Sequence, residues 1–538
     1  MSRVPRGALF VALAITLGMR LLALARVDAA GIGDPNYYND VAQAFARGEG
    51  LTSRCVWNLL ALPPDLPAPG CGYWGPGVPL VAGLAYCLAG ISLRVAQGAM
   101  IALSLILVTC ALALCVRFTA RASSPLALGL MLAFHLQLTY FGVTVDTPIP
   151  FAVAVNACLF PLALAHAGWT PGFFLALPGA LAAQLTRADG LLLPALVFAF
   201  AALATHRGRL ARSALALLVV AYLAGYGVWL VRNARAFGTP FPSSMAEGLV
   251  LEDYTDLFRI HQRPTLARFL ALGPERILRD KAGALFDNLK TLVMGENALL
   301  VPLALLALPA LVANPLAAPY LAYLVALLLA MSLAFNHQAR FGSFLHSLPS
   351  LFPFLGAAAL LGVERALARV AAWTPGRHRF LARTLLTLAP WLVIQFSALT
   401  TLPAVLAREG FGRPFAELAQ VRRTLTAWWQ RPGVGGPDVR LMSNDSLDLV
   451  GMLPPPVVQE PRDPGLDPVF ELAARYRLKY LVVFRVPRYT TRPWDQPRYT
   501  HALGELVHVG DLPAHQSELP LDGIALYEFR LAPAKPLR

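Results

Sequence analysis

Charged side chains are scarce in this sequence. Asp, Glu, Lys and Arg make up 14% of its 538 residues, whereas soluble domains carry about 25% charged residues. Hydrophobic residues account for 57% of the chain, and the mean hydropathy is positive. The shortage of charge excludes an ordinary soluble domain and predicts an integral membrane protein.

Lysine is also scarce, so the net charge of +14 comes almost entirely from arginine. The arginines gather between apolar runs, where the retention of basic residues on the cytoplasmic side of a membrane explains them. We therefore attribute the basic character to membrane topology and expect no nucleic-acid partner.

Several catalytic signatures are absent. The sequence has no Walker loop, dinucleotide-binding fingerprint, zinc-ligand spacing or Gly-x-Ser-x-Gly elbow. A soluble nucleotide-sugar or ATP site therefore has no support. We predict no specific cofactor; a divalent metal is compatible with the chain, but no residue pattern supports one.

Cysteine is rare as well, and the six cysteines show no metal-ligand spacing. Two of them, Cys55 and Cys71, share the first loop after the N-terminal apolar run. They are candidates for a disulfide if this loop faces an oxidising compartment. The sequence leaves the bridged and the free states open.

Long apolar runs are plentiful, and about 11 of them approach the length that a helix needs to cross a bilayer core of about 30 Å. They are residues 8–27, 96–116, 125–141, 148–166, 171–185, 191–205, 213–231, 298–312, 317–335, 345–363 and 384–402. The first has only a weak cleavage signal and is expected to be retained. Residues 77–91 are too short for a span and predict an interfacial or re-entrant helix.

Basic residues cluster at Arg3 and Arg6, at Arg117 and Arg121, and in segments 206–212 and 365–383. All of these fall on one side of the predicted bundle, which we assign to the cytoplasm. The composition, rich in Ala, Leu, Arg and Pro, suggests a GC-rich bacterial genome. We therefore predict that the membrane is a bacterial inner membrane. The N-terminus is then cytoplasmic, and the loops 28–94 and 232–297 are extracytoplasmic.

Hydrophobicity falls after residue 402. Residues 438–443, 480–484 and 524–529 are expected as strands, and residues 467–476 as a helix between them. We therefore predict an all-α polytopic membrane bundle over 1–402 and a small α+β extracytoplasmic domain over 403–538. Within the second external loop, residues 279–292 have the pattern of an amphipathic helix lying on the outer leaflet.

Two acidic residues in external loops are candidates for catalysis. Asp34 precedes a proline-started helix, and Asp146 repeats this arrangement in a later external loop. Each is also compatible with a simple role at a helix N-terminus. The functional alternative is a general base at the membrane boundary, where partial desolvation raises the proton affinity of a carboxylate. Asp40 lies six residues after Asp34 and is expected to face solvent.

Basic residues near the same membrane face are candidates for binding phosphate. Arg187 lies beside Asp189 between two apolar runs, and Arg340 follows His337 in another external loop. A planar guanidinium matches phosphate oxygens and stays charged. A local Arg–Asp pair for Arg187, an interfacial Arg340 and a structural His337 are the alternatives.

Aromatic residues of the first loop are candidates for contact with a sugar ring or an acceptor. They are Tyr37, Tyr38, Tyr73 and Trp74. The belt of aromatic side chains at membrane surfaces explains them equally well.

The first loop resembles that of GT-C glycosyltransferases, such as the protein O-mannosyltransferases and the lipid A aminoarabinose transferases. The family register Asp-Glu-x-x-Tyr-x-x-x-Ala-x-x-Leu-x-x-Gly-x-Gly is matched by Asp34, Tyr38, Ala42, Phe45, Gly48 and Gly50. Further similar motifs follow in order at residues 73–80, 185–191, 229–242 and 340–341. The resemblance covers about residues 3–402, and Pro35 replaces the second acid of the family pair.

The resemblance implies transfer of a sugar from a polyprenyl-phosphate carrier to a glycan, lipid or protein on the outer face of the membrane. Asp34 is then the group that deprotonates or orients the acceptor, with Asp146 as its acidic neighbour. Arg187 and Arg340 are implied to neutralise the leaving phosphate. Because the candidate charges lie at the external ends of the spans, this function is favoured over a transporter or flippase of a lipid-linked glycan. A non-catalytic scaffold for envelope assembly is the other alternative.

Overall fold

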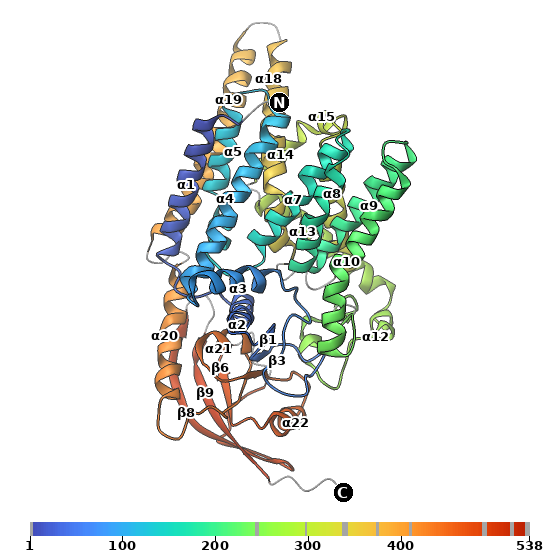
Figure 1. Cartoon of the computed structure of the whole chain (residues 1–538). Coiled ribbons are helices and arrows are strands. Elements are labelled where there is room, and N and C mark those ends of the chain that lie inside the picture. Colours follow the sequence, from blue (N-terminus) through green and yellow to red (C-terminus); the bar gives the residue numbers. More distant parts are fainter. Residues whose placement is uncertain are drawn as a thin grey trace.

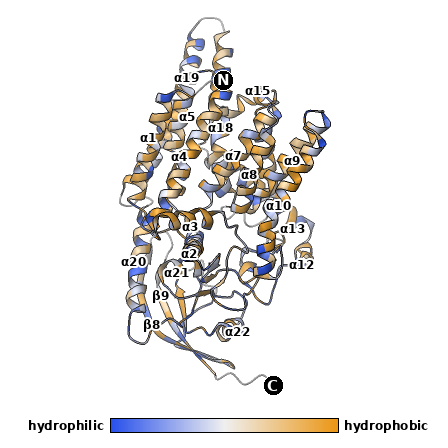
Figure 2. Ribbon diagram, in the orientation of Figure 1, coloured by the Kyte–Doolittle hydropathy of each residue, from blue (hydrophilic) through white to orange (hydrophobic). Residues whose placement is uncertain are grey.

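A bundle of apolar helices occupies one end of the molecule, and a β-sheet with its flanking helices occupies the other (Figure 1). The computed structural model describes residues 4–242, 247–295, 298–335, 343–372, 376–407, 412–486, 492–516 and 521–532. Hydrophobic residues dominate the bundle, and hydrophilic ones become frequent in the sheet layer (Figure 2). This division matches the predicted membrane region and the predicted polar C-terminal region.

Six helices in the described part of the chain are long and apolar enough to cross a membrane. They are α1 (Arg6–Leu24), α4 (Leu93–Phe118), α7 (Pro148–His166), η1 with α9 (Ala188–His206), α10 (Arg212–Phe237) and α19 (Arg377–Leu406). A seventh span is present if the segments Ser343–Ser350 and Phe352–Ala371, bent by 60°, are counted together. Shorter apolar helices are α3 (Gly77–Ala89), α5 (Ser124–Ala133), α8 (Gly172–Thr186) and the segment Ala318–Ala334. The predicted count of about 11 spans is therefore not confirmed.

Two of the predicted runs are broken. Residues 298–312 form α14 (Leu300–Leu305) and α15 (Leu308–Val312), and residues 125–141 form α5 and α6 (Leu136–Phe141). At the second break Arg20 of α1, only 1% exposed, donates hydrogen bonds to the carbonyls of Leu132 and Ala133 and to Thr139 Oγ1. A buried charge in a membrane segment is costly unless polar groups surround it. The freed carbonyls supply those groups, a role for Arg20 that the sequence analysis missed.

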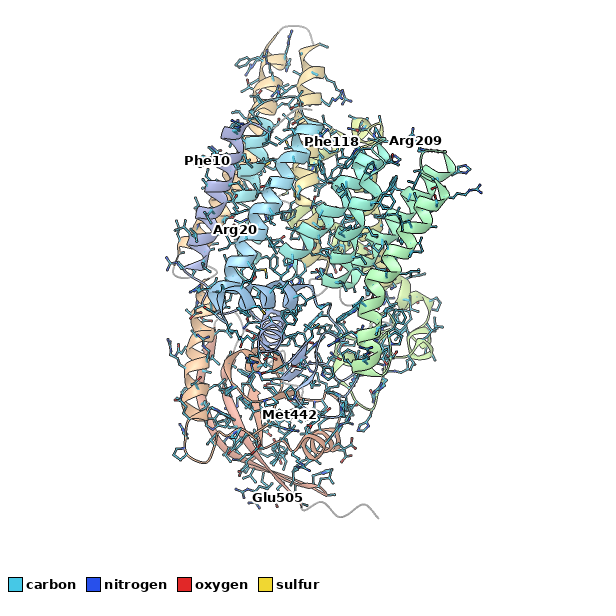
Figure 3. The ribbon with its side chains drawn as sticks, in the orientation of Figure 1. Phe10, Arg20, Phe118, Arg209, Met442 and Glu505 are labelled. Carbon is cyan, nitrogen blue, oxygen red and sulfur yellow. The ribbon has the colours of Figure 1, made fainter. Side chains whose placement is uncertain are left out.

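The outer face of the bundle carries exposed apolar side chains, and the end away from the sheet carries basic ones. Figure 3 shows Phe10, which is 74% exposed, on the outer face of α1, and Arg209 at the end of the bundle away from the sheet. Val220 and Leu223 of α10 are also exposed and apolar, as is expected of a surface that faces lipid. The basic segment 206–212 thus lies at the end opposite the sheet layer.

The first loop lies between the bundle and the sheet. Its helix α2 (Asp34–Ala46) packs on α3, which runs across the ends of the bundle helices (Figure 1). The expectation of a short, non-spanning helix at residues 77–91 agrees with α3. The predicted amphipathic segment 279–292 lies within α13 (Pro274–Gly295), whose Leu278 and Phe286 are exposed.

The sheet has seven strands in the order β2-β5-β4-β6-β9-β8-β7. Their bounds are β2 (Cys55–Val56), β4 (Leu441–Ser443), β5 (Val457–Gln459), β6 (Tyr480–Phe484), β7 (Arg498–His501), β8 (Gly504–Gln516) and β9 (Leu521–Leu531). Strands β2, β5, β4 and β6 pair in parallel, and the others are antiparallel. The expected strand 480–484 and the expected helix 467–476, here α22 (Asp467–Tyr476), are confirmed.

The sheet is not confined to residues 403–538. Strand β2 belongs to the first loop, and it pairs with β5 so that Cys55 lies opposite Val457 and Val56 opposite Val458. Helix α20 (Gly412–Trp429) runs alongside the sheet and contacts β8, and α21 (Ser446–Met452) lies toward the bundle and contacts α2 (Figure 1). The C-terminal region thus shares its sheet with the first loop and packs on α2 through α21.

Candidate functional site

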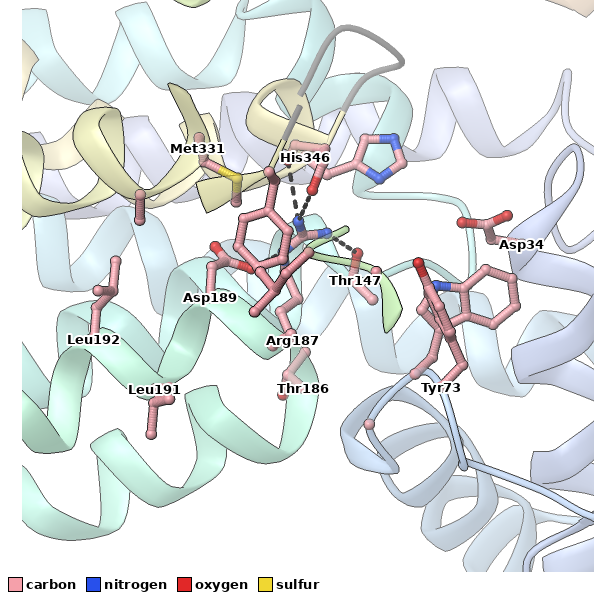
Figure 4. Close-up of a pocket in the computed structure, with 18 of the residues that line it drawn as sticks. Asp34, Tyr73, Thr147, Thr186, Arg187, Asp189, Leu191, Leu192, Met331 and His346 are labelled. Atoms are coloured by element: carbon pink, nitrogen blue, oxygen red, sulfur yellow. Dashed lines mark hydrogen bonds and ion pairs between the residues drawn. The ribbon is translucent and has the colours of Figure 1, made fainter. Parts of the chain in front are cut away.

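A cavity of about 370 Å³ lies where the first loop, the end of α8 and the segment after residue 342 meet. Its polar and aromatic lining includes Asp34, Tyr38, Trp57, Tyr73, Trp74, Thr147, Arg187, Asp189, Tyr254, Ser343 and His346. Its apolar lining includes Leu191, Leu192, Leu249, Ala330, Met331 and Phe335. Figure 4 shows Arg187 between these two parts, with Asp34 and Tyr73 on one side of it and Leu191, Leu192 and Met331 on the other.

Asp34 is the first residue of α2 and faces this cavity. The residue that caps the helix is Gly33, whose φ of 72° suits glycine. Among the described residues, no other residue forms an ion pair or a hydrogen bond with the Asp34 carboxylate. Asp34 therefore does not cap the helix, and its carboxylate faces the cavity.

The surroundings of Asp34 raise its pKa to about 7, mainly because burial disfavours the charged form. The charges of Asp146 and Asp448 raise the pKa further, while Arg187 opposes them. A carboxyl group that titrates near neutral pH is suited to exchange a proton with a substrate hydroxyl.

Asp146 lies behind Asp34 and is 4% exposed. Its Oδ1 atom accepts a hydrogen bond of 2.6 Å from the backbone N–H of Thr147. The two acidic loops are held together because Val145 donates its N–H to the Ala30 carbonyl at 2.7 Å, and because Gln97 bridges carbonyls of both loops. The structure thus brings the two predicted acids together. Asp34 lines the cavity, and the negative charge of Asp146 raises the pKa of Asp34.

Arg187 ends α8 in an extended conformation and joins three elements (Figure 4). Its Nε lies 2.9 Å from Asp189 Oδ1, one terminal nitrogen lies 3.2 Å from Thr147 Oγ1, and the other lies 3.0 Å and 3.1 Å from the carbonyl and hydroxyl oxygens of Ser343. Asp189 also accepts a 2.6 Å hydrogen bond from Ser347. The local Arg–Asp pair, which was the alternative to phosphate binding, is formed, and the same guanidinium also lines the cavity.

Two glycines let the first loop approach this arginine. A Cβ atom at Gly75 would lie 2.1 Å from the Leu185 carbonyl oxygen, and one at Gly77 would lie 2.2 Å from Thr186 Oγ1. No larger residue fits without displacing the backbone. The motifs at residues 73–80 and 185–191, which are far apart in the sequence, therefore touch directly.

One wall of the cavity is aromatic. Trp57 and Trp74 stack with ring centroids 4.0 Å apart and planes within 9° of each other, and Tyr73 meets Trp57 edge-on at 4.9 Å. Tyr38 and Tyr37 pack against Trp74. The sequence pointed to Tyr38, Tyr73 and Trp74. It gave no signal for Trp57 or Tyr254, because each lies in a loop outside the recognised motifs.

Two predicted phosphate ligands, His337 and Arg340, lie outside the described residues. Ser343 and His346, which the sequence analysis did not propose, line the cavity from the segment that follows them. The signal that could have found them is their position just after the Arg-Phe motif.

The expectation that Asp40 faces solvent is wrong. Asp40 is 3% exposed, and its carboxylate forms an ion pair of 2.7 Å with Arg54 and accepts hydrogen bonds from Ser53 Oγ and the Arg54 N–H. The chain folds back after α2, so this face of the helix is covered by the loop. Asp40 has a structural role in the first loop and does not line the cavity.

The candidate disulfide is not formed, because Cys55 and Cys71 are both free, buried thiols. Cys55 Sγ lies 3.5 Å from the Ser446 carbonyl oxygen of the C-terminal region. Burial raises the pKa of the Cys71 thiol to about 12. Of the two states that the sequence left open, the structure has the free one.

The Trp-x-x-Arg-Asn motif supports the first loop. Arg232 donates hydrogen bonds to the carbonyl oxygens of Leu51 and Gly70 at 2.9 Å and 2.8 Å. Its guanidinium also lies over the rings of Trp229 and Phe237. This motif therefore holds the loop that carries the aromatic wall. Among the described residues, no group of three or more His, Cys, Asp and Glu side chains is arranged to hold a metal ion.

No family model matches the sequence, and a search of curated proteins gives no match. Solved structures do match. ArnT from Cupriavidus metallidurans bound to undecaprenyl phosphate superimposes with a TM-score of 0.58 at 14% identity, covering 97% of this chain and 98% of that one. ArnT in the apo state gives a TM-score of 0.58 at 16% identity over the same shares. Arabinofuranosyltransferase AftD from Mycobacteria gives 0.49 at 15% identity, covering 98% of this chain and 40% of that one.

The likeness to ArnT spans nearly the whole of both chains, including the C-terminal sheet region. ArnT is a lipid A aminoarabinose transferase of the GT-C class. At these identities the likeness establishes the fold, which agrees with the motifs of the first loop. The protein is an integral membrane protein with the fold of the GT-C glycosyltransferases.

Proposed function

We propose that this protein transfers a sugar from a polyprenyl-phosphate-linked donor to an acceptor on the outer face of the membrane. The observation that carries the proposal is that Asp34, with a pKa of about 7, and the Arg187 guanidinium line the same cavity. A hydroxyl acceptor needs a proton acceptor, and a phosphate leaving group needs a positive charge. The cavity offers one of each.

In the proposed reaction Asp34 acts on the acceptor hydroxyl, which attacks the sugar, and Arg187 acts on the phosphate, which leaves it. An acceptor hydroxyl gives its proton to Asp34 while its oxygen forms a bond to the anomeric carbon of the sugar. The bond between that carbon and the phosphate oxygen breaks, and the electron pair leaves with the polyprenyl phosphate. Arg187 stabilises the charge that develops there, with the hydroxyls of Thr147 and Ser343 as additional donors.

The arrangement of the cavity supports an assignment of its two sides. The apolar side, with Leu191, Leu192 and Met331, suits the prenyl chain (Figure 4). Leu191 is 50% exposed, so this side opens toward the lipid-facing surface. The side with Asp34 and the aromatic wall then receives the acceptor.

The proposal extends to orientation. Figure 3 shows Arg209, which belongs to the basic segment 206–212, at the end of the bundle away from the sheet. The cavity is lined by Asp34 of α2, which lies at the other end (Figure 1). The positive-inside rule assigns that end to the cytoplasm of a bacterial inner membrane. The N-terminus is then cytoplasmic, and the cavity and the sheet region are extracytoplasmic.

The pH dependence of transfer follows from the raised pKa of Asp34. A general base must be deprotonated, so we expect kcat/KM for the acceptor to fall as the pH drops through about 7 and to level off above it. An unperturbed carboxyl would instead keep the enzyme active down to about pH 4. Rates measured in proteoliposomes from pH 5 to pH 9 check this, and a profile that stays flat down to pH 5 would contradict the assignment.

The aromatic wall gives a prediction about acceptor binding. Trp57→Ala should raise the acceptor KM about 5- to 10-fold with a smaller change in kcat, because an aromatic stack contributes about 1 kcal/mol. Trp57→Phe keeps an aromatic face, so its acceptor KM should lie between those of the wild type and Trp57→Ala. Trp169→Ala is the matched control, because Trp169 is 47% exposed in the turn between α7 and α8 and does not line the cavity. An unchanged acceptor KM in Trp57→Ala would remove the wall from the acceptor site.

The decisive experiment is a transfer assay with the purified protein in vesicles. A labelled polyprenyl-phosphate sugar is supplied on the cavity side, together with glycan, lipid and protein fractions of the cell envelope. The proposal expects label to move to one acceptor fraction with release of free polyprenyl phosphate. Movement of intact donor across the bilayer would identify a flippase, and neither result in any fraction would favour a scaffold.

A further inference from the structure

The C-terminal region reaches the candidate site through α21. Asp448 of this helix is 6% exposed, and its Oδ1 atom accepts a hydrogen bond of 2.7 Å from the Gly33 N–H and one of 2.9 Å from the Asn36 side chain. The two donors stand on either side of Asp34 in the chain. One carboxylate of the C-terminal region therefore contacts the backbone just before Asp34 and a side chain just after it.

This contact completes the start of α2. The N–H groups at the beginning of a helix have no partner within the helix, and a negative charge there is favourable. Asp448 supplies that charge from outside the helix, where the cap residue Gly33 has no side chain to do so. The conformation that aims Asp34 into the cavity thus depends on a residue more than 400 positions later in the sequence.

The packing around the contact requires close approach. A Cβ atom at Gly451 would lie 2.5 Å from Asn36 Oδ1, so α21 can lie against α2 only because this position is glycine. The pairing of β2 with β5 attaches the same loop to the C-terminal region a second time. The segment from Gly33 to Val56 is thereby fixed at both ends by residues 445–459.

We infer that Asp448 is a positioning residue for Asp34, so that the C-terminal region forms part of the site. This inference rests on the proposed function. Asp448 does not line the main cavity or touch the Asp34 carboxylate; it acts through Gly33 and Asn36.

Other titratable and charged groups surround Asp34 and Asp448. Asp34 also faces Asp146, Arg187, Tyr38 and Tyr73, and His346 lines the same cavity. Asp448 has Asp445 beside it, and Asp28 and Arg422 line a small hollow next to it.

Asp445 is partly buried and Asp448 is buried, but the Gly33 N–H and the Asn36 side chain stabilise the charge of Asp448 alone. Burial raises the pKa of Asp445 to about 8, and burial also raises the pKa of Asp448, while the Gly33 N–H and Asn36 lower it. Two donors on one oxygen favour the ionised form of Asp448. Its negative charge is one of the causes that raise the pKa of Asp34, so removing it should shift that pKa downward.

The test compares Asp448→Ala, Asp448→Asn and Asp34→Asn in the full-length protein in vesicles. Asp448→Ala removes both hydrogen bonds and should lower kcat about 10- to 100-fold, as a small misplacement of a catalytic group does. Asp448→Asn keeps an acceptor oxygen without the charge. It should therefore retain most of kcat and move the acidic limb of the pH profile to lower pH.

Asp463→Ala is the matched control. Asp463 also belongs to the C-terminal region, and it accepts two backbone hydrogen bonds, from Ile260 and His261 at 2.7 Å and 3.0 Å. It does not line the cavity. Its loss should lower the melting temperature as much as Asp448→Ala does while leaving kcat and the pH profile unchanged.

The outcomes separate this inference from the proposed function. If Asp34→Asn is inactive and Asp448→Ala has the wild-type kcat, the inference fails and the proposed function stands. If Asp34→Asn keeps the wild-type activity, the assignment of Asp34 as the general base fails, and the inference about Asp448 fails with it. The proposed function itself fails if the wild-type protein transfers no sugar from the labelled donor to any acceptor fraction. If Asp448→Ala does not fold, Asp448→Asn and Asn36→Ala provide the test. The inference is overturned if the acidic limb of the pH profile does not move in Asp448→Asn and kcat stays at the wild-type value in Asn36→Ala.

Discussion

Asp34→Asn should abolish sugar transfer, lowering kcat by about 10²- to 10⁴-fold, the usual contribution of a positioned general base. The amide keeps the shape of the side chain but cannot accept the proton of the acceptor hydroxyl. Donor binding should change little, because the phosphate is expected at Arg187. The measurement is single-turnover transfer from a labelled polyprenyl-phosphate sugar, with donor and acceptor KM determined separately.

The same variant makes an independent prediction about stability. Because the folded state raises the pKa of Asp34 from 3.8 to about 7, ionising this group opposes folding, and the cost is fully present above pH 7. Asp34→Asn removes that cost, so its melting temperature at pH 8 should equal or exceed that of the wild type. A gain in stability with a loss of activity is the pattern expected at a functional site.

Asp40→Asn is the matched control on the same helix. Asp40 is buried against Arg54 at 2.7 Å, so its substitution should lower the melting temperature. The folded fraction should nevertheless transfer sugar at a rate close to that of the wild type, because Asp40 does not line the cavity. Wild-type turnover in Asp34→Asn, or a dead but stable Asp40→Asn, would contradict the roles assigned here.

Arg187→Lys should lower kcat about 100-fold while the protein stays folded. Lysine keeps the positive charge, but it has no planar fork with which to contact Asp189, Thr147 and Ser343 at once and still face a phosphate. Charge stabilisation of a leaving group in a poorly hydrated site contributes several kcal/mol, and losing one well-placed donor costs about 10²- to 10³-fold. Inhibition by free polyprenyl phosphate should weaken in parallel, which gives a readout independent of turnover.

Lysine is the better first substitution, because a neutral residue at position 187 would leave Asp189, 3% exposed, without its charged partner. Breaking a buried pair in that way destabilises a protein by about 3 to 5 kcal/mol and would confuse lost folding with lost chemistry. Arg492→Lys is the control. Arg492 and Glu460 form a pair of 2.8 Å with side-chain exposures of 12% and 4%, nearly those of Arg187 and Asp189, but they do not line the cavity. If both lysine variants lose transfer equally, Arg187 has no special role toward phosphate.

Local patterns in the sequence led to much of the site, for physical reasons that particular residues illustrate. A proline-started helix after an apolar run places Asp34 at a membrane boundary whatever the rest of the chain does. The helix break at Arg187 follows from the polar residues between two apolar runs. These are short-range consequences of hydropathy and backbone chemistry, and the structure agrees with them.

Other features depend on contacts between distant segments and had no local signal. Asp40 is buried because the loop after α2 folds back to bring Arg54 onto it. Trp57 joins the aromatic wall because β2 pairs with β5, about 400 residues later in the chain. The predicted count of about 11 spans is not confirmed, because apolar runs such as 125–141 satisfy hydropathy whether they form one straight helix or two shorter ones. The break depends on Arg20 in another helix.

The sequence by itself determined that this is a membrane protein, that the segments between its apolar runs carry Asp34, Asp146 and Arg187, and that its first loop resembles that of GT-C glycosyltransferases. Hydropathy and short motifs carry this information because they depend on residues close together in the chain. Only the tertiary structure decided which acid faces the cavity, how the near-neutral pKa of Asp34 arises and that Asp448 holds the start of its helix. Burial and electrostatic interaction depend on distances in space, and folding alone brings residues hundreds of positions apart within those distances.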